Sequence, residues 1–265
     1  MADDDRLRAG WLARLCACAD APELAPREAL TYGPRQMRIG SVEPSLAQRL
    51  GQAELLRRGS GSGWQVLTPL DASLALIARW LHAQGLGGRW RDELLAVTDE
   101  QLGQVSVVER GAVRALGITT FAVHLVVARA DGHVWVQQRA MNKATDPGQW
   151  DTTMGGQVAA GETVAQALER ETWEEAGLLA AQLQGLREAG GIMIRRPVAE
   201  GYMVEHIDVL EATLADSMQP VNQDGEVQRF ECLSPDGLRA RLLEDSFTLE
   251  AGLILAHWLQ RRSQF

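Results

Sequence analysis

One stretch of this chain places three carboxylates close together on a predicted helix. Residues 156–178 read GQVAAGETVAQALERETWEEAGL, and their pattern predicts a helix over residues 163–176. Glu171, Glu174 and Glu175 are related by three- and four-residue spacings, so they fall within roughly a 100° arc of that helix. Like charges at these spacings weaken a helix by roughly 0.2–0.5 kcal/mol per pair, and a divalent cation removes that cost.

These glutamates predict a metal site made of oxygen ligands, which suits Mg²⁺ or Mn²⁺. Val164, Leu168 and Thr172 recur at intervals of four residues. We expect this stripe to pack the helix against a sheet while the carboxylates face outward. Three glutamates on a helix are also common on an ordinary solvated surface, so the cluster alone does not decide between the two interpretations.

The wider spacing decides in favour of a functional site. Glu162 follows Gly156 after five residues, Arg170-Glu171 follow after seven more, and Glu174-Glu175 precede Gly177 and the apolar Leu178. This pattern resembles the full sequence box of the Nudix hydrolases, with Thr172 in place of the family's large aliphatic residue. The resemblance implies Mg²⁺-dependent hydrolysis of a diphosphate that is linked to another group. It also implies an α/β (α+β) fold in which the Nudix domain is an αβα sandwich with a mixed sheet.

The resemblance also implies roles for individual residues. Glu171, Glu174 and Glu175 would be catalytic and would bind the metal, with the backbone carbonyl of Gly156 as a further ligand. Arg170 and Glu162 would form the ion pair that orients the loop and helix. Many Nudix enzymes use one more acid from outside the box, and Glu226 is the first candidate for it, with Glu205 second. Both acids would also fit an ordinary surface position.

A second resemblance covers the chain from about Met37 onward and narrows the group. It is similar to Nudix proteins that carry an uncharacterised N-terminal domain, to the N-terminal half of fungal thiamin pyrophosphokinases and to related plant Nudix hydrolases. The motifs that carry it are Trp90-Arg91-Asp92-Glu93-Leu94, Gly117-Ile118, Arg139 with Lys143, Pro147-Gly148, Asp151 and Asp224-Gly225-Glu226-Val227. This resemblance implies cleavage of thiamin diphosphate, or of its oxidised forms, to the monophosphate and phosphate.

Three alternatives stay open within the Nudix fold. The substrate can be a nucleoside diphosphate derivative, or the fold can serve as a ligand-sensing module without catalysis. Intact glutamates in the box argue against the sensor. The third alternative is isopentenyl-diphosphate isomerase, which Asn142-Lys143 and Trp150-Asp151 also resemble. That enzyme needs a cysteine and histidines in the loop before the box, and residues 152–157 contain neither.

Four residues outside the box are candidates for substrate binding. Arg139 and Lys143 follow a predicted hairpin and suit a terminal phosphate, although both also fit a solvated surface. Trp90 and Tyr202 are the aromatic residues that we expect to stack on a heteroaromatic group, with Trp90 in the hydrophobic core as the alternative. We expect the histidines in or beside strands, His124, His133 and His206, to be structural or exposed.

The composition excludes several other classes of protein. The 265 residues carry a net charge of −9, which disfavours binding to nucleic acids. The acidic start, Met1-Ala2-Asp3-Asp4-Asp5, does not resemble a signal peptide, and apolar runs are too short to span a bilayer. The three cysteines are too scattered for a zinc site. We therefore expect a cytoplasmic monomer or homodimer that acts on a small molecule and has no membrane or nucleic-acid partner.

The order of predicted elements indicates two domains, a small α+β domain over residues 1–116 and a Nudix domain over 117–265. We expect strands at 37–42 and 64–67, with helices at 6–20, 44–50 and 72–81, the last capped by Asp71. A hairpin turning at Asp131-Gly132 opens the second domain, and a loop over 142–161 precedes the glutamate-rich helix. Strands at 191–194, 203–213 and 227–232 and helices at 235–243 and 249–261 complete the chain.

Overall fold

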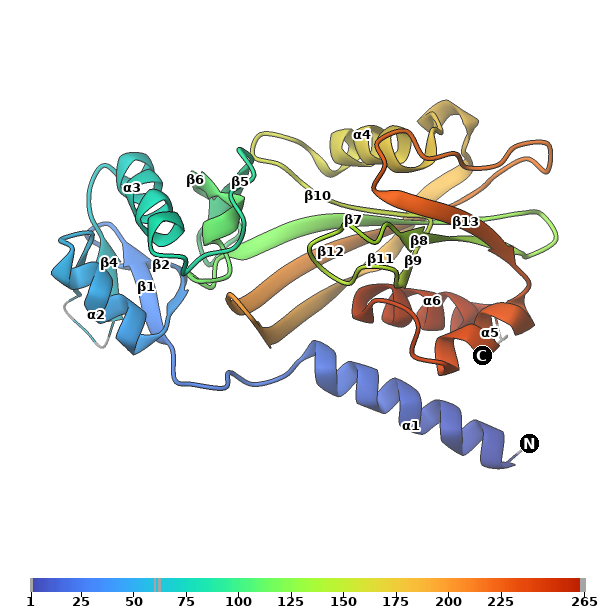
Figure 1. Ribbon diagram of the computed structural model, residues 1–265, viewed down its shortest axis with the longest axis horizontal. Helices are drawn as coiled ribbons and strands as arrows, with labels where there is room; N and C mark the ends of the chain where they lie inside the picture. Colours follow the sequence, from blue (N-terminus) through green and yellow to red (C-terminus); the bar gives the residue numbers. More distant parts are fainter. Residues whose placement is uncertain (1, 60, 62, 263–265) are drawn as a thin grey trace.

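The largest sheet of the described chain has seven strands and forms the body of the C-terminal half. A computed structural model of the chain describes residues 2–59, 61 and 63–262 (Figure 1). The strands run in the order β11-β12-β7-β8-β13, with β10 beside β7 and β9 beside β8. Their bounds are β7 Thr119–Ala128, β8 Val134–Arg139, β9 Trp150–Asp151, β10 Met154–Gln157, β11 Gln184–Val198, β12 Gly201–Thr213 and β13 Val227–Leu233. Because β12 is parallel to β7 while the other pairs are antiparallel, the sheet is mixed, as expected.

Helices cover both faces of this sheet. In Figure 1, α4 (Val164–Ala176) lies on one side, and α5 (Pro235–Leu243) and α6 (Leu249–Arg261) lie on the other. Successive residues of β7 alternate between the two layers: Val123 and Leu125 pack in the core beside α4, and Ala122 and Val126 pack in the core beside α6. The predicted αβα sandwich is therefore confirmed.

A second sheet and two helices form the N-terminal unit, by which we mean residues 28–116. Its four strands run in the order β2-β1-β4-β3, and a separate hairpin, β5-β6, completes it. The bounds are β1 Glu28–Tyr32, β2 Met37–Val42, α2 Pro44–Gln52, β3 Leu56–Arg58, β4 Gly63–Val66, α3 Leu70–Ala83, β5 Leu94–Thr98, β6 Gln104–Glu109 and the short η1 Arg110–Ala112. Leu74, Ile77, Ala78 and Leu81 of α3 are buried, as the predicted stripe requires.

Three details differ from the sequence expectations. Pro69, not Asp71, is the residue that precedes α3, and Asp71 accepts a hydrogen bond from the Ser106 hydroxyl instead. The expected loop over 142–161 contains β9 and β10, because it pairs with β8 and then with β7, two strands that pair with each other only near their shared turn. Strands β1, β3, β5 and β6 lack a strong alternating pattern, and the sequence analysis missed them.

Within the described residues, no helix combines the length and apolar character needed to cross a bilayer.

The first helix belongs with the C-terminal half of the molecule. Helix α1 (Ala2–Ala19) packs against α6, and its Trp11 is buried there with its indole nitrogen donating to Asp245 at 2.8 Å. We retain the boundary at Leu116 and Gly117 as a proposal, with α1 as a segment that crosses to the second domain. The long connection from α1 brings the N-terminal unit to the tip of the β11-β12 hairpin (Figure 1).

Backbone hydrogen bonds join the N-terminal unit to the sandwich. Ala160, in the loop before α4, donates to the Leu94 carbonyl at 2.8 Å, and Tyr202 donates to the Arg114 carbonyl at 2.9 Å. These contacts fix the loop of the box and the hairpin tip against the same unit. The cavities described below lie at this junction.

Candidate active site

Local signals explain why the glutamate-rich helix begins and ends where it does. Thr163 caps α4 by accepting from the Gln166 amide at 3.2 Å, while the Gln166 side chain accepts from the Thr163 amide at 2.9 Å. Gly177 ends the helix in the left-handed conformation, with φ of 61°. These two ends fix the position of every acidic side chain between them.

Arg170 holds the loop and the helix together, as the sequence predicts. Its guanidinium donates to both oxygens of Glu162, at 2.8 and 2.9 Å, and to the backbone carbonyl of Gln157 at 3.1 Å. The Arg170 hydrogen bonds lower the pKa of Glu162. The same guanidinium reaches Glu171 at 2.7 Å and Glu174 at 3.2 Å, so one cation organises three carboxylates.

Glu175 is buried, which corrects the expectation that all three glutamates face outward. Its Oε2 accepts from Gln137 Nε2 at 2.9 Å and from the Gly155 amide at 3.0 Å. At 100° per residue, Glu175 falls in the same arc as Leu168 and Thr172, and all three side chains are buried. Glu174 is the outermost of the three, with 43% of its side chain exposed.

The two inner carboxylates are held in surroundings that oppose their charge. Burial, together with the nearby charge of Glu171, raises the pKa of Glu175 to about 8. Burial also raises the pKa of Glu171 to about 7, with Glu174 and Glu226 adding to the effect and Arg170 opposing it. An added cation would favour ionisation of both groups.

Two adjacent glycines make room on both faces of β10. A Cβ at Gly156 would lie 2.1 Å from Cδ of Glu171, and one at Gly155 would lie 2.6 Å from the ring of His124. The Glu171 carboxylate therefore rests directly over the Gly156 backbone. Carboxylate and carbonyl oxygens are the donors that a hard divalent cation prefers, so this donor set fits Mg²⁺ or Mn²⁺. Within the part of the chain that the structure describes, no three acidic, thiol or imidazole side chains converge as a complete metal cluster.

The two candidate acids outside the box have different surroundings. Glu226 lies close enough to raise the pKa of Glu171, and it pairs with Lys143. Burial opposes the charge of Glu226, but Lys143 outweighs it and lowers the pKa of Glu226. Glu205 is buried and already engaged: it accepts from Arg114 at 2.8 Å, Thr120 at 2.6 Å and Gln157 at 2.5 Å. This geometry favours Glu226 over Glu205 as the additional acid.

A cavity of about 580 Å³ lies beside the box, between the sandwich and the N-terminal unit. Gly155, Gly156 and Gln157 line it, together with both predicted phosphate-binding residues, Arg139 and Lys143. Arg139 is held by Asp151 at 3.2 Å. The three box glutamates are not among the lining residues, so β10 and Lys143 connect the cavity to them. Its other cationic residues come from outside the box: Arg89, Arg91, Arg110, Arg114 and Arg196.

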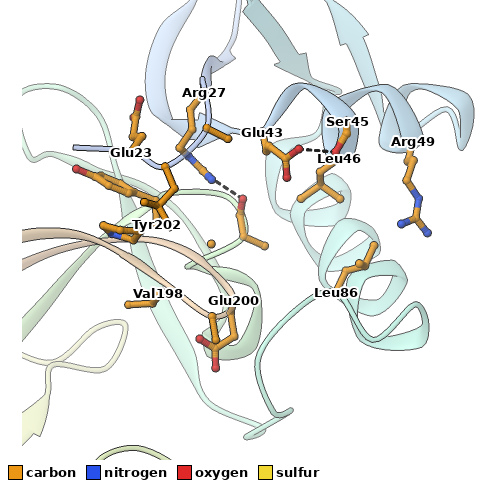
Figure 2. A pocket seen from close by; sticks show the side chains of 16 residues that line it. Glu23, Arg27, Glu43, Ser45, Leu46, Arg49, Leu86, Val198, Glu200 and Tyr202 are labelled. Atoms are coloured by element: carbon orange, nitrogen blue, oxygen red, sulfur yellow. Dashed lines mark hydrogen bonds between the residues drawn. The ribbon is translucent and has the colours of Figure 1, made fainter. Parts of the chain in front are cut away.

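The two predicted stacking residues lie elsewhere. Figure 2 shows Tyr202 in an adjoining cavity of about 350 Å³, near Arg27 and Glu23, and its hydroxyl donates to the Ala21 carbonyl at 2.9 Å. Trp90 packs on the core of the N-terminal unit, 5.3 Å from the His82 ring. Neither residue lines the larger cavity, so their positions do not fit the expected stacking on a substrate there.

Gln137 was not singled out from the sequence, and His124 was expected only to be structural or exposed. Gln137 is a buried amide in an apolar strand, and such a residue needs a partner, which is Glu175. His124 is buried over Gly155 and beside Asp151, and burial lowers its pKa, so it stays neutral. A polar residue in the middle of a strand was the available signal for both.

Comparison with known families agrees with this geometry. The NUDIX domain profile matches residues 119–251, half of the chain. This chain belongs to the Nudix family.

An uncharacterised Nudix hydrolase of Pseudomonas aeruginosa is 35% identical over 105 residues, which are 40% of this chain and 60% of that protein. Nudix hydrolase 24 of Arabidopsis thaliana, named as chloroplastic, is 28% identical over 138 residues, which are 46% of this chain and 34% of that protein. An isopentenyl-diphosphate isomerase of Rhodobacter capsulatus is 28% identical over 142 residues, which are 53% of this chain and 78% of that protein. The matched part therefore covers less than two thirds of the first two relatives.

Proposed function

We propose that this chain is a divalent-metal-dependent hydrolase of diphosphate bonds. The observation that carries the proposal is the pair of inner carboxylates, Glu171 over the Gly156 backbone and Glu175 on the Gly155 amide, where burial disfavours their charge. Two ionised carboxylates in such surroundings destabilise the folded protein unless a bound cation offsets their charge. Glu171, Glu174, Glu175, Glu226 and the Gly156 carbonyl would hold the metal.

The residues around this set divide the chemistry between them. When bound, Mg²⁺ or Mn²⁺ supplies positive charge that neutralises the diphosphate and makes water more acidic. Arg170 orients Glu171 and fixes the β10 backbone through Gln157. Lys143 and Arg139, which reach the cavity, bind phosphate oxygens. Glu226 or Glu175 accepts the proton that the attacking water loses.

The substrate in this proposal is thiamin diphosphate or an oxidised analogue, cleaved to the monophosphate and phosphate. Its support is the resemblance of residues 90–94, 117–118 and 224–227 to the thiamin-related Nudix group. A nucleoside diphosphate derivative is the alternative substrate. The proposal includes a cytoplasmic location and no nucleic-acid partner. The cysteines described in the structure, Cys16, Cys18 and Cys232, line neither cavity, which favours a hydrolase over an isomerase that needs a cysteine.

A diphosphate panel tests the proposal. The substrates are thiamin diphosphate, oxythiamin diphosphate, ADP and ADP-ribose, with chromatography of the monophosphate products in Mg²⁺ and in EDTA. We expect turnover of at least one substrate in Mg²⁺, none in EDTA, and a loss of roughly two to four decades in Glu171→Gln. Glu169→Gln, an exposed glutamate on the same helix, is the matched control and should keep wild-type turnover. No product from any substrate would favour the ligand-sensing alternative.

A further inference from the structure

Glu250 is an acid in the larger cavity that neither the box nor its predicted partners use. It lies in the first turn of α6, two residues after the capping Thr248, and both residues line the cavity. A helix N-terminus favours a negative charge. Burial nevertheless outweighs this and raises the pKa of Glu250 to about 7. Among residues whose side chains the structure describes, none forms an ion pair with Glu250 within 4.0 Å.

Arg196 lines the same cavity and has a donor without a partner in the described chain. It lies near the tip of the β11-β12 hairpin, and its Nε is buried without a hydrogen-bond partner within the described chain. Buried donors are nearly always paired, and an unpaired one costs about 1–3 kcal/mol. Arg196 is near enough to lower the pKa of Glu250, and no ion pair or hydrogen bond joins the two side chains in the described chain. The cavity wall thus carries an acceptor from α6 and a donor from β11.

This pair is separate from the charges that surround the box. The charges that act most on Glu250 are Glu205, Arg196 and Asp151, whereas Glu171 responds to Arg170, Glu174 and Glu226, and Glu175 responds to Glu171 and Lys143. Glu205 and Asp151 are already held, by Arg114 and Arg139. Glu250 and Arg196 therefore remain available for the part of a substrate that extends beyond its phosphates.

We propose that Glu250 and Arg196 recognise a nitrogen heterocycle that carries an exocyclic amine at the far end of the diphosphate substrate. The Glu250 carboxyl accepts from the amine, and the Arg196 guanidinium donates to an adjacent ring nitrogen. A single flat group with one donor and one acceptor edge satisfies both side chains. The inference rests on the proposed diphosphate hydrolysis and names its specificity. An aminopyrimidine, as in thiamin, and an aminopurine, as in adenine nucleotides, share this chemistry.

Matched pairs of compounds that differ only at the amine and the adjacent ring nitrogen test the subsite. Thiamin diphosphate against oxythiamin diphosphate forms one arm, and ADP against IDP forms the other, since an oxo group replaces the amine in the second member of each pair. Methyl diphosphate, which has no ring, reports on hydrolysis alone. We expect wild-type kcat/KM to favour the amine by about 10- to 100-fold in one arm, because an unpaired polar group in the subsite is costly. The arm that shows the preference identifies the ring.

Variants then assign the preference to the two residues. Glu250→Gln and Arg196→Met should reduce it to within about threefold and leave methyl diphosphate hydrolysis unchanged. Glu200→Gln, an exposed glutamate that lines the same cavity on the hairpin tip, is the control and should keep the preference. Equal wild-type rates for both members of both pairs would overturn the proposal. The proposal would also be overturned if Glu250→Gln lowered the hydrolysis of methyl diphosphate as much as that of the amine compounds.

Calorimetry separates this inference from the proposed hydrolysis. Thiamin monophosphate against its oxythiamin counterpart, and AMP against IMP, are titrated into metal-free protein, where no turnover occurs. A tenfold or greater preference for one amine compound that Glu250→Gln abolishes supports the subsite, even if no diphosphate is cleaved. Equal affinities within both pairs would refute the subsite while leaving the hydrolysis intact.

Discussion

Replacing Glu175 by glutamine should stabilise the metal-free protein while abolishing most of its activity. Burial, with the charge of Glu171, raises the pKa of Glu175 from 4.5 to about 8. In the unfolded chain the group returns to its ordinary pKa. The folded state therefore holds more protons than the unfolded state between pH 4.5 and 8, and stability falls as pH rises through this window.

The size of the effect follows from the same values. At pH 7, which is 2.5 pH units above 4.5, keeping the carboxyl protonated costs the fold about 3 kcal/mol at about 1.4 kcal/mol per unit. Glutamine resembles the protonated acid and keeps an oxygen that accepts from Gln137 and Gly155. We expect Glu175→Gln to raise the free energy of unfolding by about 3 kcal/mol at pH 7 and by almost nothing at pH 4.5. Turnover in Mg²⁺ should fall by roughly two to four decades.

Urea unfolding in EDTA, followed by tryptophan fluorescence at both pH values, measures the gain. Glu169→Gln removes an exposed charge from the same helix and should change stability by less than about 0.5 kcal/mol. The reasoning is refuted if Glu175→Gln is no more stable than wild type at pH 7, or if Glu169→Gln shows the same gain.

Three further predictions concern helix α4, strand β10 and the metal. The Thr172 hydroxyl is buried with no hydrogen-bond partner in the described chain. Thr172→Val should therefore raise the free energy of unfolding, measured with urea, by about 1–2 kcal/mol. A lower free energy of unfolding in this variant would show that the hydroxyl is bonded. Gly156→Ala should lower turnover at least about 100-fold with unchanged circular dichroism, because its Cβ would displace Glu171, whereas Gly10→Ala, with open space around it, should have no effect on either. Mn²⁺ should replace Mg²⁺ in turnover assays while Ca²⁺, with its longer and looser coordination, supports little; equal rates with Ca²⁺ would contradict a site that demands compact geometry.

Sequence reasoning succeeded where the signal is local. The pattern predicted a helix over residues 163–176, and the resemblance to the Nudix box implied the ion pair of Arg170 with Glu162; the residues in these contacts lie no more than 8 positions apart. The bounds of α5 and α6 follow equally from local periodicity. The outward position of Glu175 was wrong because three acids were treated as one polar face, although their spacing already put Glu175 beside Leu168.

Other features depend on contacts between distant parts of the chain. Lys143 and Glu226 are 83 residues apart and meet only because β13 pairs with β8. Arg114 reaches Glu205 across 91 residues through the parallel pairing of β7 and β12. Trp90 looked available for a substrate, but the position of the N-terminal unit buries part of it in that unit's core. No spacing in the sequence specifies these pairings.

The central claim is that the carboxylates over Gly156 hold the metal that hydrolysis requires. The most direct measurement is Mn²⁺ binding by electron paramagnetic resonance, with turnover of the preferred diphosphate recorded on the same samples. We predict that wild-type protein binds Mn²⁺ and turns over in proportion to the bound metal, and that Glu171→Gln loses both while Glu169→Gln keeps both. Undiminished turnover in samples with no bound Mn²⁺ and excess EDTA, or metal binding that survives loss of Glu171, would contradict the claim.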